Sequence, residues 1–404
     1  MGIRLSFIII TLLSFDVHAQ TILNSKHNLS VSGPGTVIST SESEVCIFCH
    51  TPHNSNAQAP LWNRNSSTAT YTIYDNAISS SLNASPTQPD GSSILCLSCH
   101  DGTVALGEVA SRTTDIFDGA GGKMPVGSTN LGTNLSNNHP ISFVYDANLA
   151  GADGGLKFPP NYPANVDGNS KLQCTSCHDP HDNINGSFLL ASTRNSGLCV
   201  SCHDKNLWNA SSHNTSPATW NNAGTNPWAH IKAPYSTVAE NGCANCHANH
   251  NAPGDAQILK SNLEEDNCLD CHNGNVAQTD IASQLIKTFR HDVVGYNDIH
   301  QPEDVIPFDP HVECADCHNP HAANGSSANA PDANGAIAGM SGIDQNGSPI
   351  TNILFEYQLC FRCHADNPVT GANTSRVIED VNTRFEFAPG AIPFHPVEIK
   401  GKNS

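Results

Sequence analysis

Cysteine and histidine, the residue types best able to form covalent thioether and metal bonds, recur in this sequence at one fixed spacing. All 16 cysteines belong to Cys-x-x-Cys-His units. The units, numbered one to eight in chain order, begin at Cys46, Cys96, Cys174, Cys199, Cys243, Cys268, Cys314 and Cys360. Disulfides give no reason for a histidine after each pair, and zinc ribbons do not require one. Two thiols followed by an imidazole are typical of covalent haem attachment, so the sequence predicts eight haems c.

Each unit provides two attachment cysteines and one iron ligand. On one helical turn, cysteines three residues apart point to the same side, and the histidine that follows lies on that face and reaches the iron. The predicted attachment residues are Cys46, Cys49, Cys96, Cys99, Cys174, Cys177, Cys199, Cys202, Cys243, Cys246, Cys268, Cys271, Cys314, Cys317, Cys360 and Cys363. The predicted proximal ligands are His50, His100, His178, His203, His247, His272, His318 and His364.

Four units carry a second histidine three residues after the first, at His53, His181, His250 and His321. Such a histidine lies on the same side of its own porphyrin as the proximal ligand and cannot reach the opposite face. Any iron that it binds therefore belongs to another haem, and the two haems must lie close together. We interpret the four as distal ligands that link neighbouring haems; ordinary surface histidines are the alternative.

The units with the second histidine alternate with units that lack it, so the predicted repeat is a pair of haems, here called a doublet. Further candidate distal ligands lie outside the motifs, at His27, His139, His213, His291, His311 and His395. His230 and His300 fit surface or supporting roles better. Because the candidates outnumber the eight irons, the sequence leaves the individual pairings open.

The composition predicts a fold that is organised by cofactors. Aromatic residues make up only 6% of the chain, so few side chains are available for a large apolar core. We expect a multihaem cytochrome c fold of mostly coil, with short α-helices at the haem motifs, little β-structure, and loops that wrap a repeat of haem pairs. The predicted segments are a signal peptide (1–19), an N-terminal tetrahaem module (20–225) and a C-terminal tetrahaem module (226–404).

The N-terminus and the net charge limit where the protein works and what it binds. Arg4, an apolar run from Ile8 to Phe15 and Ala19 at the expected cleavage point indicate a secretory signal that is too short to span a bilayer. We expect an exported protein without a membrane span, in the periplasm or at the extracellular cell surface. A net charge of −19 argues against nucleic acid as a partner.

Residues from about 24 to 203 resemble a known group of proteins. The resemblance is carried by "SKHNLSVSG", "CIFCHTPHN", "CLSCHDGTVALG", "NHPISFVYD" and "CTSCHDPH". These segments are similar to the exported tetrahaem cytochromes of metal-reducing bacteria, some of which polymerise into extracellular haem filaments. The resemblance implies that His27, His53, His139 and His181 are distal ligands, one of which can be donated across a subunit boundary. Residues from about 226 to 404 resemble the doubled Cys-x-x-Cys-His modules of larger multihaem cytochromes.

We therefore expect a non-enzymatic protein that conducts electrons along closely packed haems with two imidazoles per iron. The expected partners are other redox proteins, extracellular acceptors such as metal oxides, or further copies of the chain in a filament of the nanowire type. Two alternatives remain open. One is a soluble periplasmic electron shuttle, and the other is a multihaem reductase of nitrite, hydroxylamine or tetrathionate, which keeps one iron open for its substrate.

Overall fold

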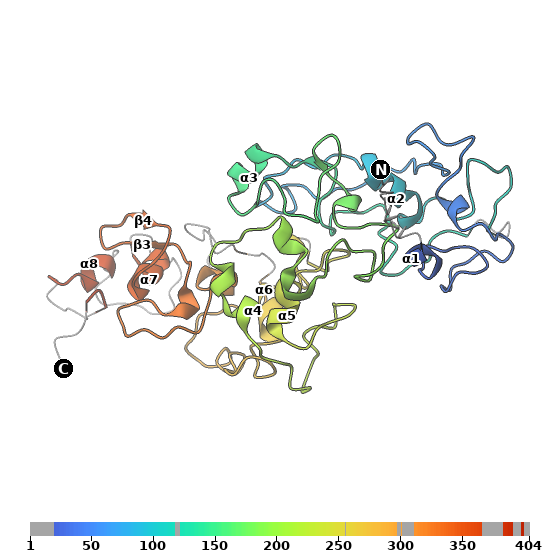
Figure 1. Cartoon of the computed structure of the whole chain (residues 1–404). Coiled ribbons are helices and arrows are strands. Elements are labelled where there is room, and N and C mark those ends of the chain that lie inside the picture. The colour runs from blue at the N-terminus through green and yellow to red at the C-terminus, as the bar shows by residue number, and fades with distance from the viewer. Residues whose placement is uncertain are drawn as a thin grey trace, which may run out of the picture.

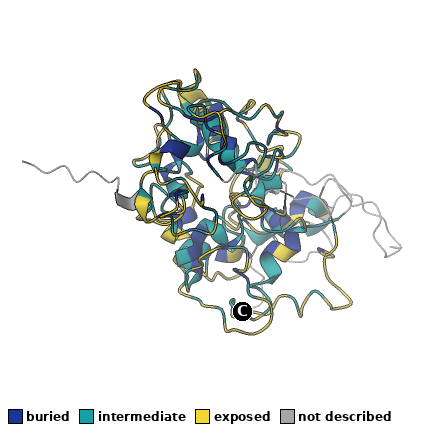
Figure 2. Cartoon of the chain, turned by 90° about the vertical axis from the view of Figure 1, so that its right-hand side faces the viewer, coloured by how far each residue is buried: buried dark blue, intermediate teal, exposed yellow. Residues whose placement is uncertain are grey.

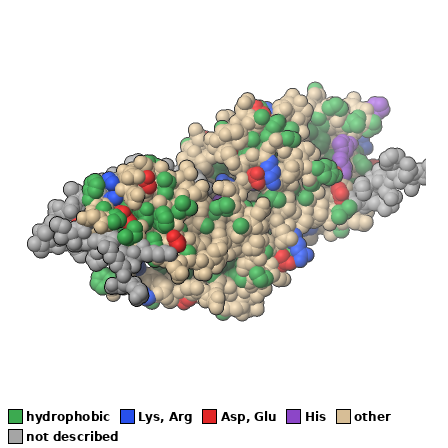
Figure 3. Space-filling view, turned by 60° about the vertical axis from the view of Figure 1, so that its left-hand side comes forward, with side chains coloured by type: hydrophobic (Ala, Val, Ile, Leu, Met, Phe, Trp, Pro, Cys, Tyr) green, Lys and Arg blue, Asp and Glu red, His purple; other side chains and the backbone are tan. Residues whose placement is uncertain are grey.

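A computed structural model describes residues 20–117, 122–254, 256–296, 300, 311–365, 383–390 and 397–399. The predicted signal peptide and His395 lie outside these residues. The chain winds along an elongated body, with the N-terminal helices towards one end and the C-terminal helices at the other (Figure 1). The face shown in Figure 3 carries few charged side chains among polar and apolar ones.

Short helices separated by loops make up most of the regular structure. The α-helices are α1 (Gln20–Leu23), α2 (Gly91–His100), α3 (Ala147–Asp153), α4 (Ser212–Thr215), α5 (Val238–Asn241), α6 (Glu264–Leu269), α7 (Glu356–His364) and α8 (Thr383–Phe387). The 3-10 helices are η1 (Cys46–Phe48), η2 (Cys174–Ser176), η3 (Arg194–Ser196), η4 (Cys199–Ser201), η5 (Trp208–Ala210), η6 (Gly242–Asn245), η7 (Ala256–Ile258), η8 (Cys314–Asp316) and η9 (Gly335–Ile337). Of the helices that the structure describes, none combines the length and the hydrophobicity needed to cross a bilayer.

Local sequence signals set the ends of the helices outside the motifs. The Asp146 side chain accepts a hydrogen bond from the Leu149 N–H (2.9 Å) and caps α3, and Gly154 ends that helix with a left-handed φ of 70°. Thr237 and Glu240 form a capping box at the start of α5, in which each side chain accepts a hydrogen bond from the other's backbone N–H. Helices α3 and α5 are short because residues that cap a helix occur only a few positions apart in the sequence.

The β-structure in the described chain consists of two small antiparallel sheets. Strand β1 (Phe143–Val144) pairs with β2 (Lys171–Leu172), with Phe143 opposite Leu172. Strand β3 (Gly342–Ile343) pairs with β4 (Pro349–Ile350), with Gly342 opposite Ile350. The predicted fold class, mostly coil with short helices at the motifs and little β-structure, is thus confirmed.

Apolar packing is divided among four small clusters instead of one core. The clusters of buried residues comprise Ile47, Phe48, Val109 and Ile116; Tyr71, Leu97 and Leu135; Phe143, Tyr145 and Leu172; and Ile343, Tyr357, Phe361 and Ala365. Figure 2 shows the buried segments dispersed among loops that are half-buried or exposed. A chain of this size normally buries a much larger continuous core, so its loops need other material to pack against.

The two predicted modules contact each other closely. The His139 N–H donates to the Asn249 carbonyl (2.9 Å), and the Ala252 N–H donates to the Asn137 carbonyl (2.9 Å). These bonds join residues from both sides of the predicted module boundary at 225/226. The boundary therefore runs through a region of contact, and it stays a sequence prediction.

Candidate haem sites

Each of the eight Cys-x-x-Cys-His units lies on or next to a helical turn. Units one, three, four, five and seven lie on η1, η2, η4, η6 and η8, and the others lie on α2, α6 and α7. In six units the histidine N–H donates to the carbonyl of the first cysteine, at N···O distances of 2.8–3.1 Å; the histidines are His50, His178, His203, His247, His272 and His318. This turn places the two cysteines and the histidine on one face, as the attachment of one haem requires.

Seven of the eight proximal imidazoles face a second imidazole across a gap. The pairs and their centroid distances are His27–His100 (6.1 Å), His50–His181 (6.0 Å), His139–His203 (6.2 Å), His178–His250 (6.2 Å), His213–His272 (6.2 Å), His247–His321 (6.4 Å) and His291–His364 (6.1 Å). Imidazoles on opposite sides of one metal ion, each with a metal–nitrogen distance of about 2 Å, have centroids about 6.3 Å apart. Each gap therefore fits a single iron between two imidazoles, which is the arrangement that a haem with two histidine ligands needs.

The pairs follow two rules of chain order. In units one, three and five, the facing imidazole is the second histidine of the unit two positions later: His181 faces His50, His250 faces His178, and His321 faces His247. In units two, four, six and eight, the facing imidazole comes from a segment upstream of the doublet: His27, His139, His213 and His291. Two pairs, His178–His250 and His213–His272, cross the predicted module boundary.

Backbone carbonyls hold the imidazoles in one orientation. The contacts run from His100 Nδ1 to Thr129 O (2.7 Å), His178 Nδ1 to Ser187 O (3.0 Å), His247 Nδ1 to Gln257 O (3.0 Å), His139 Nδ1 to Pro140 O (3.0 Å) and His213 Nδ1 to Pro320 O (2.8 Å). Because a carbonyl can only accept, each Nδ1 carries the proton and each Nε2 keeps its lone pair for a metal. Ser187 and Gln257 adopt left-handed φ values of 48° and 56°, a strained conformation typical of functional positions.

Burial keeps the imidazoles of His27, His203 and His321 neutral. Burial, the larger cause, and neighbouring imidazoles together lower the pKa of His27 to about 4 and the pKa values of His203 and His321 to about 3. Neutral imidazole is the form that binds a metal ion. His27, His203 and His321 are therefore available as ligands at neutral pH without first losing a proton.

Consecutive doublets also meet through their cysteines. The thiols of Cys96 and Cys174 lie close enough to perturb each other's pKa, as do those of Cys199 and Cys243 and those of Cys268 and Cys314. Each contact joins the second unit of one doublet to the first unit of the next. The three contacts thus connect the four doublets in chain order.

One proximal histidine and one second histidine differ from the others. The His318 Nδ1 donates to the Ala336 carbonyl (2.9 Å), as in the other units, but no imidazole in the described ranges faces its ring. His53 occupies the same motif position as His181, His250 and His321, yet within the described chain its ring faces no motif imidazole. Both His53 and His318 are exposed.

The other candidate histidines do not approach the motifs in the same way. His311 stacks on Tyr296 with a centroid distance of 4.1 Å, and the structure brings no described motif imidazole against it. The Nε2 of His230 bonds the Ala244 carbonyl (2.7 Å), so its ring lies against the backbone of unit five and does not face a motif imidazole. His395 lies outside the described residues, so its place as a ligand stays a prediction.

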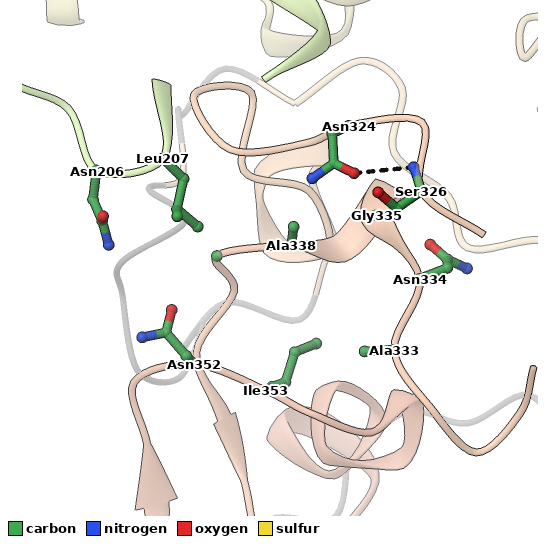
Figure 4. Close-up of a pocket in the computed structure, with 11 residues that line it drawn as sticks. Asn206, Leu207, Asn324, Ser326, Ala333, Asn334, Gly335, Ala338, Asn352 and Ile353 are labelled. Carbon is green, nitrogen blue, oxygen red and sulfur yellow. Dashed lines mark hydrogen bonds between the residues drawn. The ribbon is translucent and has the colours of Figure 1, made fainter. Parts of the chain in front are cut away.

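A cavity of ≈ 390 Å³ lies between Asn206–Leu207 and the segment from Asn324 to Ile353 (Figure 4). Its lining consists of asparagine, serine and small or branched apolar residues, and none of the lining residues is ionisable. General acid–base chemistry needs a titratable side chain within reach of the substrate. We therefore assign no catalytic role to this cavity.

Comparison with known proteins agrees with this geometry. The family described as "Doubled CXXCH motif" matches residues 166–207 and 236–277, which contain the second and third doublets. Together with the geometry of the units, this match defines the chain as a multihaem c-type cytochrome with doubled Cys-x-x-Cys-His modules. The chain is similar to the "Multiheme cytochrome MtrA" of Shewanella baltica (strain OS185), with 24% identity over 209 residues. The aligned region covers 48% of this chain and 43% of that relative, so the chain spans less than half of the relative's length.

Proposed function

We propose that the chain carries electrons along a series of eight covalently attached haems. The observation that carries this proposal is the set of linking imidazoles. His181, His250 and His321 each lie three residues after one proximal ligand and face the proximal ligand of another unit. When bound, the haems supply one-electron Fe(III)/Fe(II) couples, and their chemistry is that of the cofactor. The chain supplies placement and electrostatics.

The histidine pairs suit electron transfer better than catalysis. A haem held between two such imidazoles would have both of its free ligand positions filled, so none would be left for a substrate. The carbonyls of Ser187 and Gln257 fix the orientation of His178 and His247, and the same ligands can therefore serve both oxidation states. The net charge of −19 opposes the addition of electrons and lowers the potentials of the series. A relative named as a multiheme cytochrome supports this assignment at the level of the class.

We propose further that the protein is exported and passes electrons to other redox proteins or to extracellular acceptors such as metal oxides. The signal-like segment before Ala19 supports export. An extracellular acceptor lies outside the cell. A series of haems that extends through an elongated body is suited to carry electrons to it (Figure 1).

Copies of the chain are proposed to join head to tail through His53 and His318. In units one, three and five, the second ligand comes from the unit two positions later, and for unit seven that position lies beyond the eight units. The first unit of a second copy would continue the rule and present His53. Because both imidazoles are exposed, His53 of one copy can reach His318 of another. Repetition of this contact builds a filament.

Replacement of His53 by alanine tests this contact. The variant is expected to lose filaments in negative-stain electron microscopy, to keep eight haems per chain, and to gain one high-spin haem in its electron paramagnetic resonance spectrum. His230→Ala is the matched control, because His230 bonds a backbone carbonyl and should leave assembly and spin state unchanged. Unaltered filaments in His53→Ala, or a monomeric wild-type protein in which all eight haems are low-spin, would contradict the proposed contact.

The lack of a facing imidazole at His318 within the described ranges also supports a second candidate function. A reductase of nitrite, hydroxylamine or tetrathionate needs one open iron, and no imidazole in the described ranges faces His318. Titration of the reduced monomeric protein with carbon monoxide or nitrite distinguishes the candidates. Binding at one haem in eight, with turnover of nitrite, favours the reductase. No binding in a protein that stays monomeric favours a periplasmic shuttle.

A further inference from the structure

The four doublets meet at three junctions, each between the second unit of one doublet and the first unit of the next. At every junction, a backbone N–H of the later attachment turn bonds a side chain that stands three or four residues before the first cysteine of the earlier unit. These bonds run from Cys174 N to Ser93 Oγ (3.0 Å), from Cys243 N to Ser196 Oγ (3.0 Å) and from Ala315 N to Glu264 Oε1 (2.6 Å). The junction is therefore a repeated element of the structure.

A second contact at each junction involves the residue just before the linking histidine. Its carbonyl bonds the histidine that faces the second unit of the preceding doublet. The pairs are Pro180 O with His27 Nδ1 (3.4 Å), Asn249 O with the His139 N–H (2.9 Å) and Pro320 O with His213 Nδ1 (2.8 Å). The linking histidine that follows faces the first unit of the same doublet. One short segment thus contacts the iron ligands of both units in the doublet before it.

Glu356 has the same place at the C-terminal end of the series as Glu264 has at the third junction. Each glutamate stands four residues before the first cysteine of its unit, and each begins its helix, α7 or α6. Glu264 bonds the attachment turn of unit seven. Glu356 is half-buried and, in the described chain, accepts a hydrogen bond from Asn334 Nδ2 (3.3 Å) and from no attachment turn. Its carboxylate is therefore placed for a turn that the same chain does not supply.

Two imidazoles at this end also lack their junction contacts. The ring of His291 faces His364 at 6.1 Å, but its Nδ1 makes no hydrogen bond to the described residues, in contrast to His27 and His213. His318 has a supporting carbonyl and, within the described ranges, no facing imidazole. Units seven and eight therefore form one side of a fourth junction.

Unit one carries the other side of that junction. Its attachment turn, η1, receives no capping hydrogen bond from a side chain of the described chain. Pro52 corresponds in the motif to Pro180 and Pro320, and both Pro52 and the linking histidine His53 are exposed. Helices α1 and α2 and helix α7 lie towards opposite ends of the elongated body (Figure 1), so a single chain does not close this junction on itself.

The exposure of the cysteines identifies the same two ends. Of the sixteen cysteines, Cys46 and Cys360 are exposed, and the others are partly buried. At the internal junctions the first cysteines of two units lie close together, as Cys96 and Cys174 do. Cys46 and Cys360 are the first cysteines of units one and eight, so a fourth junction would bring them together. This observation is independent of the histidines.

We propose that the fourth junction forms between two copies of the chain, with unit one of one copy packed against units seven and eight of another. Glu356 bonds the η1 turn of the second copy, the Pro52 carbonyl of that copy bonds His291, and its His53 reaches His318. The proposal rests on the head-to-tail contact argued above and extends it from one ligand to a surface. Because the two sides of the surface differ, the contact is heterologous and can repeat without closing.

Two variants of the haem-loaded, full-length protein, each altered on one side of the junction, test the proposal when they are mixed. Glu356→Lys replaces the acceptor by a cation that repels the backbone N–H groups, and His53→Ala removes the linking imidazole. Each variant alone is expected to be monomeric in sedimentation velocity. An equimolar mixture is expected to form 1:1 dimers, because the C-terminal end of His53→Ala and the N-terminal end of Glu356→Lys are both intact. A mixture that stays monomeric would overturn the proposal.

A milder substitution with a matched control covers the case in which Glu356→Lys does not fold. Glu356→Ala should weaken assembly by about ten- to a hundredfold, the range expected for the loss of one hydrogen bond to a charged group. Glu240→Ala removes another half-buried glutamate, which caps α5 in the middle of the chain, and should leave assembly unchanged. Equal assembly of the two alanine variants would contradict the role of Glu356.

Electron paramagnetic resonance tests the contact between Pro52 and His291. Assembly should convert the haem of unit seven from high-spin to low-spin. It should also shift the low-spin signal of unit eight, because a carbonyl bonded to an imidazole increases its strength as a ligand. A change at one haem alone would show that Pro52 does not reach His291.

Failure of the junction and failure of the filament give different results. If His53→Ala abolishes assembly and the Glu356 variants assemble like the wild type, the ligand contact stands and the proposed surface is wrong. If the wild-type protein is itself monomeric at every concentration, the filament proposal fails, and the junction fails with it.

Discussion

Replacement of His250 by alanine should give one more high-spin haem than the wild-type protein has in the same state of assembly, while all eight stay covalently attached. The ring of His250 faces that of His178 at 6.2 Å, and alanine has no group that could close the sixth position of an iron held there. Attachment depends on Cys174 and Cys177, which the substitution does not touch. The measurement is electron paramagnetic resonance of the oxidised protein, together with carbon monoxide binding to the reduced protein, which should titrate one more site per chain than in the wild type.

His230→Ala again provides the control for this experiment. His230 lies near unit five, and its ring bonds the Ala244 carbonyl instead of facing a motif imidazole, so the variant should have as many low-spin haems as the wild type. His250→Ala should also lower the thermal stability, because the His178–His250 pair joins residues from both predicted modules. A His250→Ala protein that remains entirely low-spin and does not bind carbon monoxide would show that His250 is not an iron ligand.

Without haem, the chain should not fold. Its apolar side chains form separate small clusters, such as those around Phe48 and Tyr71, and a folded domain holds only about 5–15 kcal/mol of net stability. The entropy lost on ordering long loops is larger than such clusters can offset. The chain produced without haem attachment is therefore expected to show a coil-like circular dichroism spectrum, no cooperative melting transition and rapid proteolysis. The haem-loaded protein should melt cooperatively and resist the protease.

The comparison requires the same mature chain with and without haem attachment, at matched concentration and with the thiols kept reduced. Reduced thiols exclude adventitious disulfides as a source of order in the haem-free sample. Cooperative melting of the haem-free chain, with a native pattern of proteolytic fragments, would mean that the protein clusters are sufficient for the fold.

The fold class was predictable because the decisive chemistry is local in the sequence. A Cys-x-x-Cys-His unit occupies one helical turn, so the motif itself predicts the short helix that carries it. The low aromatic content of 6% predicted that no large apolar core would form, and the structure has small dispersed clusters. Both predictions needed only residues that are close in sequence, or the composition as a whole.

The pairing of histidines was not predictable, because it depends on contacts between distant residues. His53 and His181 occupy identical motif positions, yet only His181 faces a proximal imidazole within the described chain. His311 was a candidate because it lies three residues before Cys314, but its ring packs on Tyr296 instead. The sequence did contain one signal that could have helped: a second histidine in alternate units allows each unit to be linked to the unit two positions later.

The supporting carbonyls were also missed by sequence reasoning. Ser187 and Gln257 orient the proximal imidazoles of units three and five from left-handed backbone conformations. Neither residue type marks such a conformation in a sequence, since glycine and asparagine are the usual occupants. Every residue has a backbone carbonyl, so the sequence does not show which carbonyls accept a hydrogen bond from an imidazole. Only the structure identifies them.

The central claim is that imidazoles from different units hold the irons in one linked series. Anomalous diffraction at the iron edge, from crystals of the haem-loaded protein, locates every iron directly. The account predicts one iron between the rings of each of the seven histidine pairs and an eighth beside His318. Irons located away from His181, His250 and His321 would contradict the account.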